Sequence, residues 1–126
     1  MWTHVTSPFI DENDYDEYIS TFEIKKQNGY DSLMTVKKIQ TFLWNESGPV
    51  NYAREQEKWP RTQTIEPIYE VDSGAFIATR DSYTKYNDRI GIKPFLYPQD
   101  SIKSLDIDWP EDFELAQYVW QALHKN

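Results

Sequence analysis

The chain has 126 residues, enough for one domain with a core, and its content of 39% hydrophobic and 16% aromatic residues excludes a disordered chain. Its net charge of −8 argues against a nucleic-acid partner, and the lack of cysteine excludes disulfides and thiol chemistry. No stretch approaches the ~18 apolar residues of a membrane span, and no signal pattern opens the chain, so we expect a cytoplasmic protein that binds no membrane.

The amino-terminal part is predicted to form a strand, a helix and a second strand. An apolar-leaning run at 2–5 stops at Ser-Pro in 7–8, which is typical of a strand that ends in a turn. Residues 11–27 have helical periodicity and are closed by Asn-Gly at 28–29. A strand is predicted over 31–39. The helix carries its apolar stripe on Tyr15, Tyr18, Ile19 and Phe22.

The rest of the chain alternates between strands and helices after a long irregular stretch. Residues 40–71 contain Gly and Pro breakers and are predicted to be irregular. A strand passing into a short helix or turn is predicted over 74–83, and further strands over 92–98 and 104–108. An amphipathic helix is predicted from Pro110 onward. This alternation favours an α/β fold with a largely parallel sheet.

Two aspartates, Asp106 and Asp108, flank Ile107 in the last predicted strand. Residues two apart in a strand point to the same face, so the two carboxylates would converge while Ile107 points into the core. Carboxylate oxygens at the carboxyl end of a strand suit Mg²⁺, which commonly combines them with substrate phosphates. The alternative is local: Asp108 with Glu111 forms a capping-box-like pattern ahead of the last helix.

Five stretches, in order, resemble the CMP-N-acylneuraminate cytidylyltransferases, a family that includes enzymes acting on related nonulosonic acids. A lone Thr-Ser-Pro or Asp-x-Asp would be a weak signal, whereas five matches in register over nearly the whole chain are a strong one. The matching stretches are THVTSPF (3–9), NGYDSLMTV (28–36), QTFLWNESGPVNY (40–52), WPRTQTIEPIYEVDSGAFI (59–77) and SLDIDWPEDFELA (104–116).

The resemblance implies a partial Rossmann-like nucleotidyltransferase fold, with flanking helices and an interface arm over 42–69 within a single domain over 1–126. The family's nucleotide loop, which contains Gly and Arg or Lys after its first strand, has no match here. We therefore expect the chain to correspond to the carboxy-terminal half of such an enzyme. Its expected partners are a second copy, as a homodimer, or the missing amino-terminal half.

The resemblance also assigns roles to five residues. Asp106 and Asp108 align with the family's Mg²⁺ ligands, and Arg61 aligns with the arginine associated with the sugar acid's carboxylate. His4 occupies the place of a sugar-contacting Gln, and Ser73 occupies the place of an Asn in Asn-Gly-Ala, which puts that contact in doubt. The alternatives are a solvated loop charge for Arg61 and a satisfied, partly buried strand histidine for His4.

Three further residues receive interpretations of their own. Phe42 and Phe76 are expected in the core rather than on a ligand wall. Arg89, in the run DRIG, is expected to form an ion pair with a neighbouring acid rather than to reach the site. The aromatic residues between 42 and 69 favour a partner surface, since exposed Trp and Tyr are typical of interfaces.

The implied reaction transfers CMP from CTP to the anomeric hydroxyl of a nine-carbon keto-acid sugar and releases pyrophosphate. Positioning and electrostatics would do most of the catalysis, with Mg²⁺ as the cofactor. Without the nucleotide loop, the chain alone is expected to be inactive. The alternatives are a non-catalytic fragment or partner subunit of a split enzyme, and another sugar nucleotidyltransferase of the 3-deoxy-octulosonic acid type.

Overall fold

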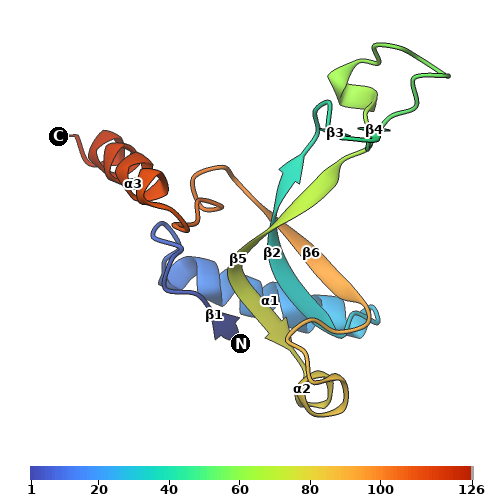
Figure 1. The fold of residues 1–126 in the computed structure, drawn as a ribbon. Helices are drawn as coiled ribbons and strands as arrows, with labels where there is room; N and C mark the ends of the chain where they lie inside the picture. The colour runs from blue at the N-terminus through green and yellow to red at the C-terminus, as the bar shows by residue number, and fades with distance from the viewer. Residues whose placement is uncertain (126) are drawn as a thin grey trace. The chain divides into compact units, whose positions relative to one another are not determined.

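A computed structural model describes residues 1–125 of the chain, which form a mixed α/β structure. In the described part, four strands form one sheet in the order β1-β5-β2-β6, and two short strands, β3 and β4, form a separate pair (Figure 1). The elements are β1 (Trp2–Thr3), α1 (Glu12–Gln27), β2 (Ser32–Ile39), β3 (Trp44–Asn45), β4 (Gly48–Pro49), a 3-10 turn (Thr62–Thr64), β5 (Ile68–Ala78), α2 (Arg80–Tyr86), β6 (Pro94–Gln99) and α3 (Pro110–Leu123).

The four-stranded sheet mixes parallel and antiparallel neighbours. β2 and β6 are parallel, with Ser32 opposite Pro94, whereas β1 and β5 are antiparallel, with Trp2 opposite Phe76. β2 and β5 also run in opposite directions (Figure 1). The expected largely parallel sheet is therefore found only at β2 and β6. No helical crossover separates β2 from β5 in the chain, and parallel neighbours need such a crossover.

α1 covers one face of this sheet. Its carboxylate cap is Asp11, which accepts bonds from the backbone of Asn13 and Asp14, and the chain leaves the helix at Gly29 with a left-handed φ of 86°. The predicted apolar stripe packs into the core, except that Ile19 is 43% exposed. The buried core cluster consists of Tyr18, Phe22, Leu33, Ala75 and Ile77.

The chain divides into two compact units, one made of 1–37 with 71–126 and the other of 38–70. Within the second unit, buried Asn51 joins the segment just before β3 to the segment just after the 3-10 turn. Its side chain accepts a bond from Leu43 N (3.2 Å) and donates to the carbonyls of Thr41 (2.8 Å) and Glu66 (3.1 Å). This unit encloses the range expected for the arm, 42–69, whose interface role stays a prediction.

One boundary and one predicted strand differ from the sequence-based prediction. β5 begins at Ile68, inside the stretch that was predicted to be irregular. The strand predicted over 104–108 is wrong, because the preceding residues form a turn around Asp100, whose carboxylate accepts the backbone N–H groups of Ile102 and Lys103 (both 2.9 Å).

Among the described residues, none of the helices combines the length and apolar character that crossing a membrane requires.

Candidate functional site

The stretch that carries Asp106 and Asp108 lies beside the amino-terminal Thr-Ser-Pro turn. The backbone N–H of Ile107 donates to the carbonyl of Thr6 (3.0 Å), and this bond joins residues that are about 100 positions apart. His4 lies two residues before Thr6, just after β1 ends. The fold thus brings two of the five family-like stretches, 3–9 and 104–116, side by side in one unit.

The two aspartates are not fixed by a strand, so their convergence no longer follows from strand alternation. Asp106 is half-buried, and its carboxylate accepts the N–H of its neighbour Ile107 (3.1 Å). Asp108 is exposed and is not the cap of α3: the carboxylate of Asp112 instead accepts the N–H groups of Asp108 (3.1 Å) and Trp109 (2.9 Å). The capping interpretation of Asp108 with Glu111 is therefore wrong.

Both candidate metal ligands retain free oxygen lone pairs. Ion pairs in the described chain join Lys85 to Asp81 and Lys103 to Asp14, and neither Asp106 nor Asp108 takes part in one. No group of three or more acidic or histidine side chains that could hold a metal is found among residues 1–125. Carboxylate oxygens are the ligand type that Mg²⁺ prefers, and the Mg²⁺ role of Asp106 and Asp108 stays a prediction.

Two buried hydroxyls lie in the same pair of segments. Ser7 Oγ and Ser104 Oγ have no hydrogen-bond partner within the described structure. A buried hydroxyl without a partner costs free energy, and such groups usually bond to ordered water or to a ligand. Near the bond between Thr6 and Ile107, the hydroxyls of Ser7 and Ser104 are therefore still able to form hydrogen bonds.

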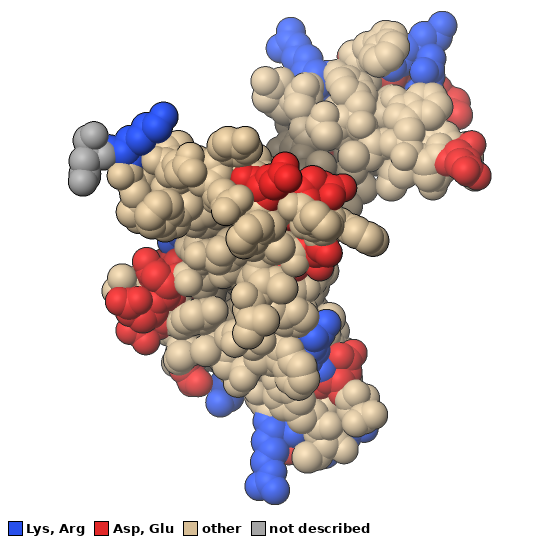
Figure 2. All heavy atoms as spheres, turned by 60° about the vertical axis from the view of Figure 1, so that its left-hand side comes forward, with Lys and Arg blue, Asp and Glu red and all other residues tan. Residues whose placement is uncertain are grey.

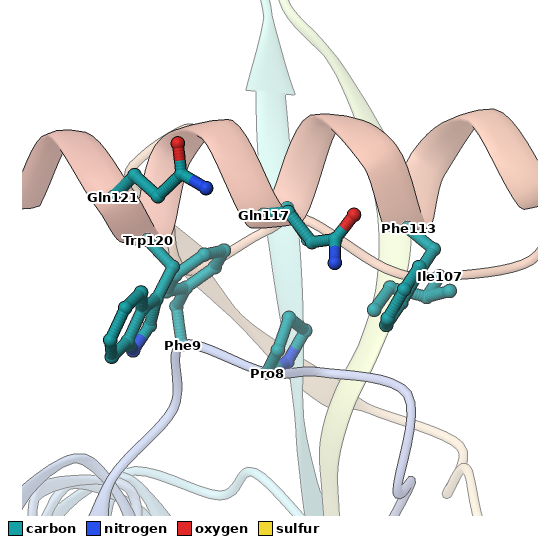
Figure 3. A pocket seen from close by; sticks show the side chains of 8 residues that line it. Pro8, Phe9, Ile107, Phe113, Gln117, Trp120 and Gln121 are labelled. Atoms are coloured by element: carbon teal, nitrogen blue, oxygen red, sulfur yellow. The ribbon is translucent and has the colours of Figure 1, made fainter.

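An apolar hollow of about 350 Å³ adjoins these segments (Figure 3). Ile107, the residue between the two aspartates, contributes to it from one side, and α3 contributes Phe113 and Trp120. Figure 3 shows these side chains directed toward Pro8 and Phe9 of the amino-terminal turn. In the view of Figure 2, α3 presents mostly uncharged side chains, and acidic side chains gather near its first turn.

His4 belongs to a cluster around Arg89 rather than to an isolated strand position. Arg89 Nη1 lies 3.1 Å from His4 Nε2, and the guanidinium stands 4.3 Å above the centre of the buried Phe76 ring. The expected ion pair of Arg89 with an acid is not found among the described residues. Phe76 is 1% exposed, as expected of a core residue, because Arg89 and His4 lie against it.

Ser73 lies at a kink in β5. Its φ of 61° is left-handed, a conformation that Asn adopts more readily than most residues and that occurs at β-bulges. Ser73 itself is half-buried, and the polar contacts at the kink are made by its neighbour Asp72.

Asp72 is the centre of a buried hydrogen-bond network that sequence reasoning missed. Its carboxylate accepts from Thr35 Oγ1 (2.6 Å), Gln99 Nε2 (2.8 Å) and Gly74 N (3.0 Å), and Gln99 in turn accepts from the hydroxyl of Tyr18. Burial and the nearby Asp14 carboxylate raise the pKa of the Tyr18 hydroxyl, which keeps it a donor. The available signal was a charged residue followed by Ser-Gly inside an apolar strand.

Arg61 belongs to the second unit, whereas the other four predicted site residues belong to the first. It is exposed and directly precedes the 3-10 turn, where its carbonyl accepts from the N–H and the hydroxyl of Thr64 (both 2.9 Å). The backbone of Arg61 is therefore held in place, while its guanidinium stays available for a ligand.

No protein-family model and no curated protein sequence matches this chain. The family interpretation consequently depends on the five motif-like stretches.

Proposed function

We propose that this chain carries the metal-binding and sugar-binding residues of a CMP-sugar synthetase. The reaction transfers CMP from CTP to the anomeric hydroxyl of a nonulosonic acid and releases pyrophosphate. One observation carries the proposal: the stretch with Asp106 and Asp108 hydrogen-bonds through Ile107 to the Thr-Ser-Pro turn, so two distant motif-like segments adjoin. The finer fold assignment, a partial Rossmann-like nucleotidyltransferase with an interface arm, is part of this proposal.

The proposed chemistry divides the work between charge neutralisation and positioning. Asp106 and Asp108 would hold Mg²⁺, which when bound offsets phosphate charge and makes a hydroxyl more acidic. Arg61, in the second unit, keeps the role that the resemblance implies, the bidentate pairing of its guanidinium with a sugar carboxylate, as a prediction of its own. His4 and the kink at Ser73 would contact the sugar. Holding the reacting groups together supplies much of the rate increase in reactions of this kind.

We also propose that the triphosphate is held by residues of another chain. None of the four glycines belongs to a phosphate-binding loop: Gly29 ends α1, Gly48 is the first residue of β4, Gly74 lies at the kink of β5, and Gly91 packs against Asp31. Metal ligands without a phosphate cradle leave the triphosphate badly placed, and misplacement by about 1 Å can cost ~100-fold in rate. The chain alone is therefore expected to be inactive.

A pyrophosphate-release assay with CTP, Mg²⁺ and a nonulosonic acid tests the proposal. The assay is run on this chain alone and with a second chain that supplies a phosphate-binding loop. We expect turnover only with both chains, and a loss of about 100-fold or more in Asp106→Ala and Asp108→Ala. Asp16→Ala, at an exposed aspartate on α1, is the matched control and should retain turnover.

The outcomes separate the alternatives. Turnover by this chain alone would contradict the division of labour. Activity with a 3-deoxy-octulosonic acid but not with nonulosonic acids would favour the other transferase, and full activity in Asp106→Ala would favour a non-catalytic partner subunit.

The arm (residues 42–69) is proposed to join two copies of the chain. It exposes large side chains, with Trp44 54%, Val50 51% and Trp59 70% exposed, and exposed Trp favours partner surfaces. We expect sedimentation to show a dimer at micromolar concentration and Trp59→Ser to shift it toward the monomer. Trp109→Ser, equally exposed at 68% but in the other unit, is the control. A clean monomer of the wild-type chain would contradict the proposal.

A further inference from the structure

Arg89 is held in place by aromatic side chains instead of by an acid. Its guanidinium lies 4.3 Å from the centre of the Phe76 ring and 5.8 Å from that of Trp2. Trp2 and Phe76 are opposite one another across β1 and β5, so the two rings and the cation lie on one face of the sheet. Stacking occupies the flat faces of a guanidinium and leaves its N–H edge free to donate.

His4 fixes the orientation of this guanidinium. Because Arg89 always donates, its bond of 3.1 Å to His4 Nε2 requires that nitrogen to be the acceptor. One of the five N–H groups is thereby used. Among residues 1–125 the structure pairs no carboxylate with Arg89, so the remaining donors keep their capacity for an oxyanion.

A hollow of about 330 Å³ opens beside Arg89, and its lining combines three kinds of chemistry. Arg89 supplies a planar cationic donor, and Trp2 and Tyr83 supply apolar ring surfaces. Asn87 and Asp88 supply an amide and a carboxylate that suit hydroxyl groups. Asp88 uses one oxygen to accept the N–H of Ile90 (3.2 Å), which leaves its second oxygen for a hydroxyl donor.

We propose that this hollow binds a small hydroxylated carboxylic acid, with Arg89 as the partner of the carboxylate and Asp88 and Asn87 as partners of the hydroxyls. His4 is a positioning residue that acts through Arg89. The single charge of a carboxylate suits the site better than the double charge of phosphate, since Asp88 lies in the same lining and the protein carries a net charge of −8. His4 also has a role in the proposed function, but the two proposals are tested separately, because binding in this hollow requires neither CTP nor Mg²⁺.

Titration of the full chain by two-dimensional NMR at pH 7.5 tests the proposal, with D-glycerate as the probe. We expect D-glycerate to shift the indole N–H signal of Trp2 and to bind with a Kd of about 1 mM. Glycerol lacks the carboxylate and should cause no shift, and acetate lacks the hydroxyls and should bind about tenfold more weakly. Inorganic phosphate should bind more weakly than D-glycerate.

Variants assign the binding to Arg89. Arg89→Gln should raise the Kd about tenfold or more, and Arg89→Lys, which keeps the charge over Phe76 but loses the fork, should raise it several-fold. Arg54→Gln is the matched control, because Arg54 also lies over two aromatic rings, at 5.6 Å from the centre of Trp44 and 5.8 Å from that of Trp59. It should leave the Kd unchanged.

The role of His4 has its own test. His4→Gln retains a side-chain acceptor and should keep the Kd within about twofold, whereas His4→Leu removes it and should weaken binding several-fold. Dispersed amide spectra show which variants remain folded, and Arg89→Lys serves if Arg89→Gln unfolds. No Trp2 shift with D-glycerate, tighter binding of phosphate, or a wild-type Kd in a folded Arg89 variant would overturn the proposal.

Discussion

Asp72, at the kink of β5, and Asp106, in the segment before α3, are both aspartates, but their carboxylates have opposite surroundings. Asp72 is 6% exposed and accepts three hydrogen bonds, from Thr35, Gln99 and Gly74, at 2.6–3.0 Å. Asp106 is half-buried, and its carboxylate accepts one bond, from the next residue in the chain. The carboxylate of Asp72 links β5 to β2 and β6 by hydrogen bonds, whereas that of Asp106 bonds only to the backbone of the adjacent residue.

This difference separates a structural carboxylate from one that is free to bind a ligand. A buried carboxylate needs partners for most of its lone pairs, and those of Asp72 are supplied by three strands of the sheet. A metal ligand needs lone pairs that the protein has not already used. The residue type alone cannot tell the two apart, since both are aspartates near apolar residues.

The largest expected effect is on stability at Asp72. Asp72→Ala should lower the free energy of unfolding by about 3 kcal/mol, because it leaves the buried groups of Thr35 and Gln99 without a partner. Asp106→Ala should change it by no more than about 0.5 kcal/mol. Urea unfolding followed by circular dichroism measures both.

The conservative variant sharpens the test. Asp72→Asn keeps an acceptor for Thr35 and Gly74 but presents an amide donor to Gln99, which must turn its own amide around, so we expect a smaller loss of about 1 kcal/mol. Equal losses in Asp72→Ala and Asp106→Ala would break the comparison, because they would show that the network around Asp72 adds no more than a half-exposed side chain does.

Most elements of the fold could be predicted because their signals are local. The helical stripe with its Asn-Gly end predicts α1, and Pro110 with the periodicity after it predicts α3. The strand predicted over 104–108 failed because Asp100 captures the N–H groups of Ile102 and Lys103 and closes a turn. Capture of this kind by an aspartate competes with strand formation and has no hydrophobic period to reveal it.

The candidate site was less predictable, since its contacts join distant residues. The network of Asp72 joins it to Thr35 and Gln99, which are 37 and 27 positions away. Arg89 was expected to find an acid, and the structure instead gives it the rings of Phe76 and Trp2. A single sequence gives the residue types but not which side chains contact one another, so these contacts could only be seen in the structure.

Asp31 is a second carboxylate that accepts several hydrogen bonds within the fold, and its contribution to stability should depend on pH. Partial burial alone would raise its pKa, but the N–H groups of Lys93 (2.9 Å) and Ile92 (2.8 Å) and the hydroxyl of Ser32 (3.1 Å) hold the pKa below its ordinary value of 3.8. The stabilisation is therefore present above pH 3.8 and is lost as the pH falls through the lower pKa of the folded state.

Asp31→Asn should accordingly destabilise the protein by about 1–2 kcal/mol at pH 7 and by much less near pH 2.5. Urea midpoints of both proteins across this range measure the gap. Asp16→Asn on α1 is an exposed control and should show no such convergence. A gap that stays constant with pH would show that the ionised form of Asp31 contributes nothing to holding the loop at 91–93.

The smallest effect is expected at two ion pairs, which differ in the burial of their acidic partner as Asp72 and Asp106 do. Lys103 pairs with Asp14, whose side chain is 6% exposed, whereas Lys85 pairs with Asp81 at 2.7 Å where both side chains are about two-thirds exposed (65% and 69%). Lys103→Met should cost about 1 kcal/mol, because it leaves a buried carboxylate without its cation. Lys85→Met should leave the urea midpoint unchanged, since water already solvates both of its charges. Equal shifts of the midpoint in the two variants would mean that burial of the acidic partner does not decide the contribution of a charge in this protein.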